Sequence, residues 1–138
     1  MSDCVFCRIV RCEIAASVVD EDEHTLAIMD AGQVNPGHVL VLVKAHVPDI
    51  YSLDDELAGA VFRSTARVAR AVKRAMAPSG VTVLQANEPD GWQTVMHLHL
   101  HVLPRRADDG VELVWPAKNP PREELDRLAA QVRAALAR

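Results

Sequence analysis

The sequence contains few aromatic residues and no long apolar run. Two Phe, two Trp and one Tyr among 138 residues leave the core to aliphatic side chains. No run approaches the roughly 18 apolar residues that a membrane-spanning helix needs, so we expect no membrane association. The N-terminal MSDCVFC lacks the basic region and long apolar stretch of a secretory signal, which predicts a cytoplasmic protein.

Cysteine is also scarce, and the 15 basic residues are outnumbered by 19 acidic ones. The three cysteines, Cys4, Cys7 and Cys12, are too few, odd in number and too clustered for a disulfide framework. A net charge of -4 disfavours broad electrostatic binding to nucleic acid. No segment interleaves aromatic and basic residues as grooves for single strands do. We therefore expect no nucleic-acid partner.

The apolar patterns predict strands that cluster and helices that interrupt them rarely. Strands are predicted at 17–22, 24–30, 37–44, 81–87 and 95–105, and helices at 4–12, from Ser52 to about Pro78, and from Pro121 onward. Ser52 and Asp55 form a helix-start pattern, and Pro78 and Gly80 end that helix. Residues 37–44 are mostly apolar at both odd and even positions, so both faces of a strand here would be apolar, which indicates a central strand. The order favours an α+β fold with a mostly antiparallel sheet.

Three of the six histidines alternate with apolar residues in 97-HLHLHVLPR-105. In a strand, His97, His99 and His101 share one face. The outer two are then roughly 13 Å apart, too far for one metal with bonds of about 2.1 Å to gather all three. Two neighbouring imidazoles are able to share a metal. A row of three indicates a division of labour, in which groups flanking a reactive imidazole orient it or neutralise its target.

The heptapeptide HLHLHVL resembles the His-φ-His-φ-His-φ-φ signature of the histidine triad (HIT) nucleotide hydrolases and transferases. CVFCRIVRCEI, VVDEDEHTLAIMD, GHVLVLVKAHVPDI and GWQTVMHLHLHVLPR are similar to family segments in the same order. The resemblance is strongest to the bacterial branch near the histidine triad nucleotide-binding proteins. It implies one domain over 1–138, with a core at about 4–106 and a C-terminal segment and helix at 107–138. It also implies a five-stranded antiparallel sheet, two main helices, and a homodimer that joins the sheets of two subunits.

The resemblance further implies a covalent mechanism on a purine nucleotide. The middle histidine, His99, would attack the α-phosphorus to form a nucleotidyl-histidine, and water would release the nucleoside monophosphate. His101 would contact the phosphate, and His97 would hold the array in place. Gln93 would bind oxygens of the α-phosphate and leaving group. The substrates implied are nucleoside phosphoramidates or dinucleoside polyphosphates.

Five further residues match substrate-binding positions of the family. Thr94 pairs with the preceding glutamine at the phosphate, and Asn87 is expected to face the phosphate from the neighbouring strand. Asp30 matches a carboxylate that binds the ribose hydroxyls, and Phe6 and Ile28 match the apolar lining of the base pocket. Each has an ordinary structural alternative, such as a turn residue or plain core.

Cys4-x-x-Cys7 has the spacing of a metal knuckle. In bacterial family members such a pair binds a structural zinc together with two histidines, which here correspond to His46 and His97. The resemblance thus implies a closed Cys₂His₂ zinc site, and no organic cofactor. Cys12 has no role in this scheme.

Three other functions stay open on the sequence. One is a nucleotide-binding regulatory module with little turnover. Another is a zinc hydrolase in which His97 and His99 bind a catalytic metal, and the third is a nucleotidyl transferase or phosphorylase. Trp92 stands where family members often have a small residue, so the substrate range is not set by the resemblance.

Overall fold

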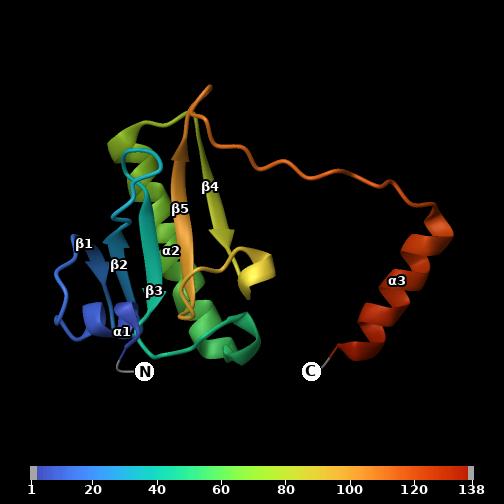
Figure 1. The fold of residues 1–138 in the computed structure, drawn as a ribbon, viewed down its shortest axis with the longest axis horizontal. Coiled ribbons are helices and arrows are strands. Elements are labelled where there is room, and N and C mark those ends of the chain that lie inside the picture. Colours follow the sequence, from blue (N-terminus) through green and yellow to red (C-terminus); the bar gives the residue numbers. More distant parts are fainter. Residues whose placement is uncertain (1–2, 137–138) are drawn as a thin grey trace.

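The computed structural model describes residues 3–136, which form one sheet, three α-helices and two short 3-10 helices (Figure 1). In chain order the elements are α1 (Val5–Val10), β1 (Val18–Glu21), β2 (Thr25–Met29), β3 (Val39–Val43), η1 (Ile50–Ser52), α2 (Asp55–Met76), β4 (Gly80–Gln85), η2 (Pro89–Gly91), β5 (His99–Arg105) and α3 (Arg122–Ala135). None of the helices within the described range is both long and apolar enough to span a bilayer.

The five strands pair antiparallel in the order β1-β2-β3-β5-β4. All five residues of β3 are buried, which confirms the central strand predicted from residues 37–44. β1 and β4 form the two edges of the sheet. The predicted α+β fold with a five-stranded antiparallel sheet is confirmed.

The two faces of the sheet carry different layers. α2 packs on one face, where ten buried residues form the larger core: Ala27, Val39, Val41, Val43, Val61, Val68, Val72, Leu98, Leu100 and Val102. α1 covers part of the other face, where its Phe6 packs with Leu26, Ile28, Leu40 and Leu42. Directly paired residues of neighbouring strands share a face. His99 pairs with Leu42 and His101 with Leu40, so both histidines lie on the α1 face.

The long helix begins later than the pattern at Ser52 predicted. Asp54 is the N-cap of α2, and its side chain accepts a hydrogen bond of 2.8 Å from the backbone N–H of Leu57. Ser52 instead ends η1, where its N–H donates to Asp49. An aspartate directly before the first turn is as good a cap as serine, so it sets the boundary. The other end agrees with the prediction, because Ala77 takes a left-handed backbone just before Pro78.

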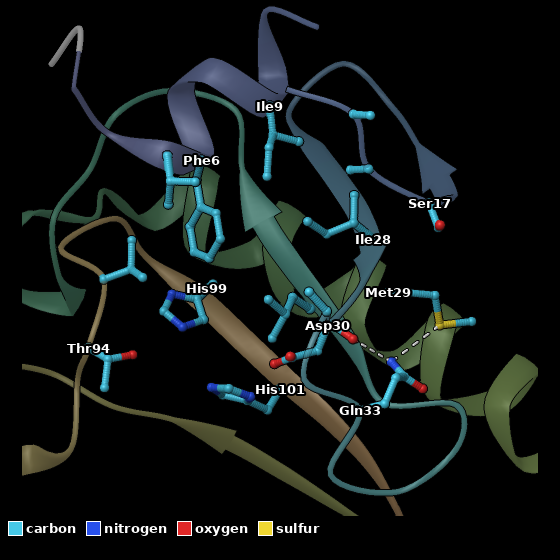
Figure 2. A pocket seen from close by; sticks show the side chains of 16 residues that line it. Phe6, Ile9, Ser17, Ile28, Met29, Asp30, Gln33, Thr94, His99 and His101 are labelled. Atoms are coloured by element: carbon cyan, nitrogen blue, oxygen red, sulfur yellow. Dashed lines mark hydrogen bonds between the residues drawn. The ribbon is translucent and has the colours of Figure 1, made fainter. Parts of the chain in front are cut away.

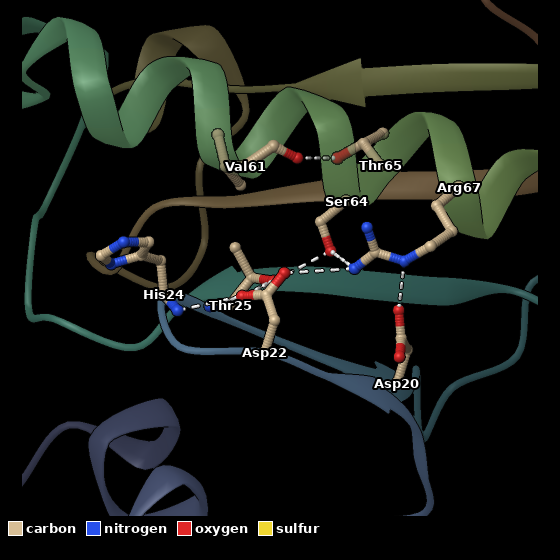
Figure 3. A network of polar contacts seen from close by, with 8 residues as sticks. All are labelled: Asp20, Asp22, His24, Thr25, Val61, Ser64, Thr65 and Arg67. Atoms are coloured by element: carbon tan, nitrogen blue, oxygen red, sulfur yellow. Dashed lines mark hydrogen bonds and ion pairs between the residues drawn. The ribbon is translucent and has the colours of Figure 1, made fainter.

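A polar network anchors α2 to the edge of the sheet (Figure 3). Arg67 of α2 donates to Asp20 at 2.7 Å and to Asp22 at 3.1 Å. Beneath it, the buried hydroxyl groups of Thr25 and Ser64 are hydrogen-bonded to each other at 2.9 Å. The half-exposed ion pairs contribute little, whereas the buried hydroxyl bond contributes about 1 kcal/mol. Together these contacts fix the helix against β1 and β2.

The five strands are all somewhat shorter than the sequence indicated, and in two of them the difference moves an expected site residue out of the strand. The strand expected at 95–105 begins only at His99, because the chain before it turns and Leu98 N–H donates to Val47 O at 2.7 Å. His97 therefore precedes the strand that carries the other two histidines. The strand expected at 81–87 ends at Gln85, which leaves Asn87 in the following loop.

The C-terminal helix stands apart from the sheet. Figure 1 shows residues 106–121 leaving the end of β5 as an extended segment, with α3 beyond the β4 edge. The apolar residues that recur at helical spacing along α3, Leu125, Leu128 and Val132, are all exposed.

Candidate functional site

A cavity of about 580 Å³ opens on the α1 face of the sheet. Its inner part is apolar, with walls from Val5, Phe6, Ile9, Ala16, Ile28, Leu40 and Val95. Its other part is polar, and Asp30, Thr94, His99 and His101 meet there (Figure 2). A cavity of this kind suits a ligand with a flat apolar end and a polar or charged end.

His99 lies at the junction of the two parts. Its Nδ1 is 2.7 Å from the carbonyl oxygen of His97. A carbonyl only accepts, so Nδ1 carries the hydrogen and the neutral ring keeps its lone pair on Nε2. Phe6 packs its edge against the ring, with centroids 5.0 Å apart. The result is a held imidazole whose basic nitrogen has no partner among residues 3–136.

His101 has the opposite tautomer. The backbone N–H of Val34 donates to Nδ1 of His38 at 3.4 Å, so the hydrogen of that neutral ring is on Nε2. Nε2 of His38 then donates to Nδ1 of His101 at 2.9 Å, which leaves His101 with its hydrogen on Nε2. The cavity therefore receives a lone pair from His99 and an N–H donor from its neighbour, with ring centroids 5.1 Å apart.

Asp30 is close enough to these rings to be a third ligand of a metal. One nitrogen from each of His38 and His101 and one Asp30 oxygen lie within 4.8 Å of one another. However, the Val34 contact places a hydrogen on the nitrogen that a metal would need. A hydrogen-bonded relay therefore fits the cluster better than an ion does.

Burial keeps the rings neutral. It lowers the pKa of His99 and of His38 below the ordinary value near 6.5. Burial, followed by repulsion from the two neighbouring rings, lowers the pKa of His101 to about 4. The Asp30 carboxylate acts in the other direction on all three but does not overcome burial. At neutral pH the pair is thus one uncharged ring that offers a lone pair and one uncharged ring that offers an N–H.

A second cluster joins α1 to the loop before β5. Cys4, Cys7, His46 and His97 each offer a ligand atom, and all four atoms lie within 4.8 Å of one another. Nδ1 of His97 is 3.4 Å and 3.5 Å from the two sulfurs, and Nδ1 of His46 is 3.2 Å from Cys7 Sγ. Sulfur and nitrogen ligands on one tetrahedral zinc are separated by about 3.6 Å, so the donor set fits a zinc ion.

The His97 ring is already arranged for such an ion. Its Nε2 donates to the carbonyl of Val43 at 2.6 Å, which leaves the Nδ1 lone pair facing the sulfurs. This is the outer-shell contact that metal-binding histidines usually make. The ring is fully buried, and its own carbonyl is the one that orients His99.

The structure brings together most, but not all, of the residues expected at the substrate. Asp30, Thr94, Phe6 and Ile28 line the cavity. Gln93 does not: it is buried, and its amide donates to the carbonyls of Pro48 and Val95 and accepts from Glu88 N–H.

Asn87 also lies outside the cavity lining. It accepts from Ile50 N–H at 2.7 Å and exchanges hydrogen bonds with Gln85. In this structure Asn87 and Gln93 hold the loop before β5 in shape. Trp92 in that loop is 60% exposed and does not line the cavity either.

The sequence interpretation missed His38. His38 directly follows the turn glycine Gly37 and is not among the predicted site residues, yet it is 3% exposed and bonded to His101. A signal was present: His38, Leu40 and Leu42 alternate, so they share a face. Pairing this strand with the triad strand brings that face to the histidines.

Known proteins are similar to this chain in both sequence and fold. The HIT domain matches residues 11–108. Protein hit of Bacillus subtilis is 36% identical, over 98% of this chain and 95% of its own. Adenosine 5′-monophosphoramidase hnt1 of Schizosaccharomyces pombe is 29% identical, over 94% of this chain and 95% of its own.

Solved structures agree. The crystal structure of a HIT family member from Bacillus subtilis superposes with a TM-score of 0.94 at 35% identity, covering 99% of both chains. A Zn-bound histidine triad family protein from Mycobacterium smegmatis superposes with a TM-score of 0.76 at 34% identity, covering 98% of this chain and 99% of that one. The alternating histidines, the antiparallel sheet and these similarities show that the chain belongs to the HIT family.

Proposed function

We propose that the protein is a nucleotide hydrolase that cleaves at the α-phosphate through a covalent nucleotidyl-histidine. The observation that carries the proposal is the pair of opposed tautomers at the polar part of the cavity. His99 offers a lone pair and His101 an N–H, side by side and both uncharged. An uncharged nucleophile suits attack on an anionic phosphate, and a fixed donor suits its developing charge.

In the first step Nε2 of His99 bonds to the α-phosphorus as the bond to the leaving group breaks. The electron pair of that bond departs with the leaving group, which takes a proton from solvent, and the His99 ring, which keeps its Nδ1 hydrogen, becomes a positively charged nucleotidyl-imidazolium. His101 donates its Nε2 hydrogen bond to a phosphate oxygen. In the second step water attacks the same phosphorus and loses a proton to solvent, the bond to His99 breaks, and a nucleoside monophosphate and a neutral ring remain.

The cavity supports a nucleotide with a purine base. Phe6 and Ile28 belong to its apolar part, which suits a flat base, while the ribose hydroxyls lie near Asp30. One oxygen of that carboxylate accepts from Gly32 N–H at 2.7 Å, and the other is available to a hydroxyl. Thr94 faces the phosphate end. We assign Gln93 and Asn87 to positioning the loop that carries Thr94.

We further propose that Cys4, Cys7, His46 and His97 hold a structural zinc. The four ligands close the coordination shell, so the ion supplies stability and a fixed position for His97 rather than a site for water. No organic cofactor enters this mechanism. The three cysteines are unpaired thiols, which suits a reducing compartment, and we place the protein in the cytoplasm. We also propose a homodimer that joins two sheets along the β4 edge.

The test measures AMP release from adenosine 5′-phosphoramidate and, separately, from diadenosine tetraphosphate. We expect His99→Ala to lower kcat by at least about 10³-fold. His24→Ala, which changes a histidine outside the cavity, is the matched control and keeps full activity. Wild type quenched with an alkaline denaturant should carry one nucleotidyl group by mass, because the phosphorus–nitrogen bond to imidazole survives base but not acid. AMP binding without release from either substrate would instead identify a binding module, and release by His99→Ala at the wild-type rate would exclude the covalent mechanism.

A further inference from the structure

Two of the four clustered ligands are thiols three positions apart at the start of α1. Cys4 is the N-cap of the helix, and Cys7 lies in its first turn. Side chains at these two positions of a helix face each other, as the partners of a capping box do. Nδ1 of His97 is 3.4 Å from Cys4 Sγ and 3.5 Å from Cys7 Sγ, so both sulfurs point to one place. They lie within 4.8 Å of each other, and a small approach brings them to the roughly 2 Å of a disulfide bond.

The two thiols differ in their access to solvent. Cys4 is partly exposed, whereas Cys7 is buried. A small oxidant therefore reaches Cys4 first, and Cys7 is the neighbouring thiol that completes the bond, as a resolving cysteine does. Cys12 is exposed but follows the C-terminal end of α1, outside the cluster. The chain thus carries one thiol pair and one separate thiol.

The residues between the two paired cysteines belong to the cavity. Val5 and Phe6 both line it, and Figure 2 shows Phe6 reaching from α1 toward His99. The Phe6 ring packs edge-on against His99 and against His97, with ring centroids 5.0 Å and 5.7 Å away. The thiol pair therefore flanks, in the sequence, the wall that holds the reactive imidazole.

The cluster also helps to hold α1 on the sheet. Phe6 and Cys7 are the buried residues of this helix. Phe6 packs in the smaller core, while the Cys7 sulfur is 3.2 Å from His46 and 3.5 Å from His97. A helix of six residues is too short to be stable by itself, so its position depends on these contacts. Loss of the cluster would let Val5 and Phe6 move together.

We propose that Cys4 and Cys7 are a redox-active pair, which a peroxide converts into a disulfide that removes two ligands from the metal site and weakens nucleotide binding in the cavity. This inference rests on the nucleotide and zinc sites proposed above. The thiolate is the form of cysteine that binds a metal, and the sulfurs of a disulfide carry no charge. His46 and His97 alone supply two of the four ligands of a closed zinc site. The oxidised site therefore no longer retains the ion, and α1 loses that attachment.

The oxidation takes two steps. The Cys4 thiolate attacks one oxygen of hydrogen peroxide, the O–O bond breaks and hydroxide leaves, which produces a sulfenic acid. The Cys7 thiolate then attacks the Cys4 sulfur, the S–O bond breaks, and a second hydroxide leaves as the S–S bond forms. The two sulfurs give up two electrons, which reduce the peroxide, and both hydroxides take protons from solvent to become water. A thiol reductant reverses the reaction by exchange.

The test uses the full-length variant Cys12→Ser, which keeps the pair and removes the separate thiol. The protein is loaded with zinc and treated with hydrogen peroxide. The intact mass without reductant should fall by about 2 Da, as a disulfide requires, and a chromogenic chelator should detect released zinc. Calorimetry should show that the Kd for AMP rises by about 10-fold or more, a usual size of coupling between two sites. Dithiothreitol and zinc together should restore the original Kd.

Cys4→Ser/Cys12→Ser is the matched control, because it has no pair to oxidise. Its Kd for AMP should be the same before and after peroxide. A rise in this variant would point to another oxidised group, such as the exposed thioether of Met29 that lines the cavity, and would overturn the proposal. Thiols of Cys12→Ser that survive the peroxide, or a disulfide that leaves the Kd for AMP unchanged, would overturn it as well.

The same measurements separate a failure of the redox pair from a failure of the proposed function. Reduced protein that binds no AMP would contradict the nucleotide site, while a mass loss of about 2 Da still supports the redox pair and its absence overturns it. Protein that holds no zinc before treatment would contradict the zinc site, while the Kd for AMP still reports whether the disulfide acts on the cavity.

Discussion

His38 provides the sharpest test of how the site is organised. Replacing it with leucine fills the buried position with an apolar side chain of similar volume but removes the N–H that holds His101. Nδ1 of His101 then lacks its partner, which costs about 1–3 kcal/mol in a partly buried site. The ring escapes that cost by moving its hydrogen to Nδ1 or by rotating. Either change turns the atom that faces the phosphate from a donor into an acceptor.

The size of the effect follows from this loss of a donor. Removing one donor from a developing phosphate or oxyanion charge costs about 10²–10³ in kcat. Because part of the His101 population retains its tautomer, we expect His38→Leu to lower kcat by about 10- to 100-fold, which is about 1.4–2.7 kcal/mol. KM should change little, because the base and ribose contacts remain.

His38→Gln is the matched variant. Its side-chain amide presents an N–H near the position of the histidine Nε2, so kcat should recover to within about fivefold of wild type. The assay is steady-state AMP release from adenosine 5′-phosphoramidate, with Tm measured for each variant. Equal losses in the leucine and glutamine variants would show that packing, not the hydrogen bond, matters. Wild-type kcat in His38→Leu would refute the assignment of the His101 tautomer.

Two further predictions concern stability. Cys7→Ser removes one ligand of the Cys₂His₂ cluster and should lower Tm by roughly 10 °C or more. The control Cys12→Ser changes an exposed thiol outside the cluster and should shift Tm by less than about 2 °C. Equal Tm shifts, or zinc that stays bound to Cys7→Ser, would contradict the zinc site. Acid should also destabilise the fold, because the pKa of His101 is about 4 in the native state and about 6.5 when unfolded. The unfolded chain takes up the proton first. The contribution of the neutral His101 ring to the free energy of unfolding is therefore complete above pH 6.5, and up to about 3 kcal/mol is lost as pH falls toward 4. Urea unfolding at several pH values checks this. In His101→Gln the free energy of unfolding should fall less between pH 6.5 and 4 than in wild type, and an equal fall would show that other groups cause the loss.

The polar loop before β5 shows where reasoning from residue types reaches its limit. Gln93 and Asn87 are in the positions that the family resemblance assigns to phosphate contacts. The structure uses their amides on the main chain of Pro48, Val95 and Ile50 and on Gln85. A sequence shows which hydrogen-bonding groups are present but not which partners the chain folds next to them.

The sequence alone determined the features that depend on local pattern. Alternation in 97-HLHLHVL-103 predicted the strand that carries His99 and His101, although not that His97 precedes it. The apolar residues at both odd and even positions of 37–44 predicted the central strand, since strand periodicity is a local property. Cys4-x-x-Cys7 likewise predicted a metal knuckle from its spacing.

Only the tertiary structure decided what depends on residues far apart in the chain. It brought His38 to His101, 63 residues away, and Cys7 to His97, 90 residues away. The contact with His38 assigns the hydrogen of His101, and thereby the N–H that this ring offers to the cavity. It also placed the apolar residues of α3, Leu125, Leu128 and Val132, outside both core clusters of the sheet. Their helical periodicity alone predicts that one face of the helix is buried, but not against which surface. The physical reason is the same in both cases: a hydrogen bond or an apolar contact acts over a few ångströms in space, and the fold sets which residues come that close.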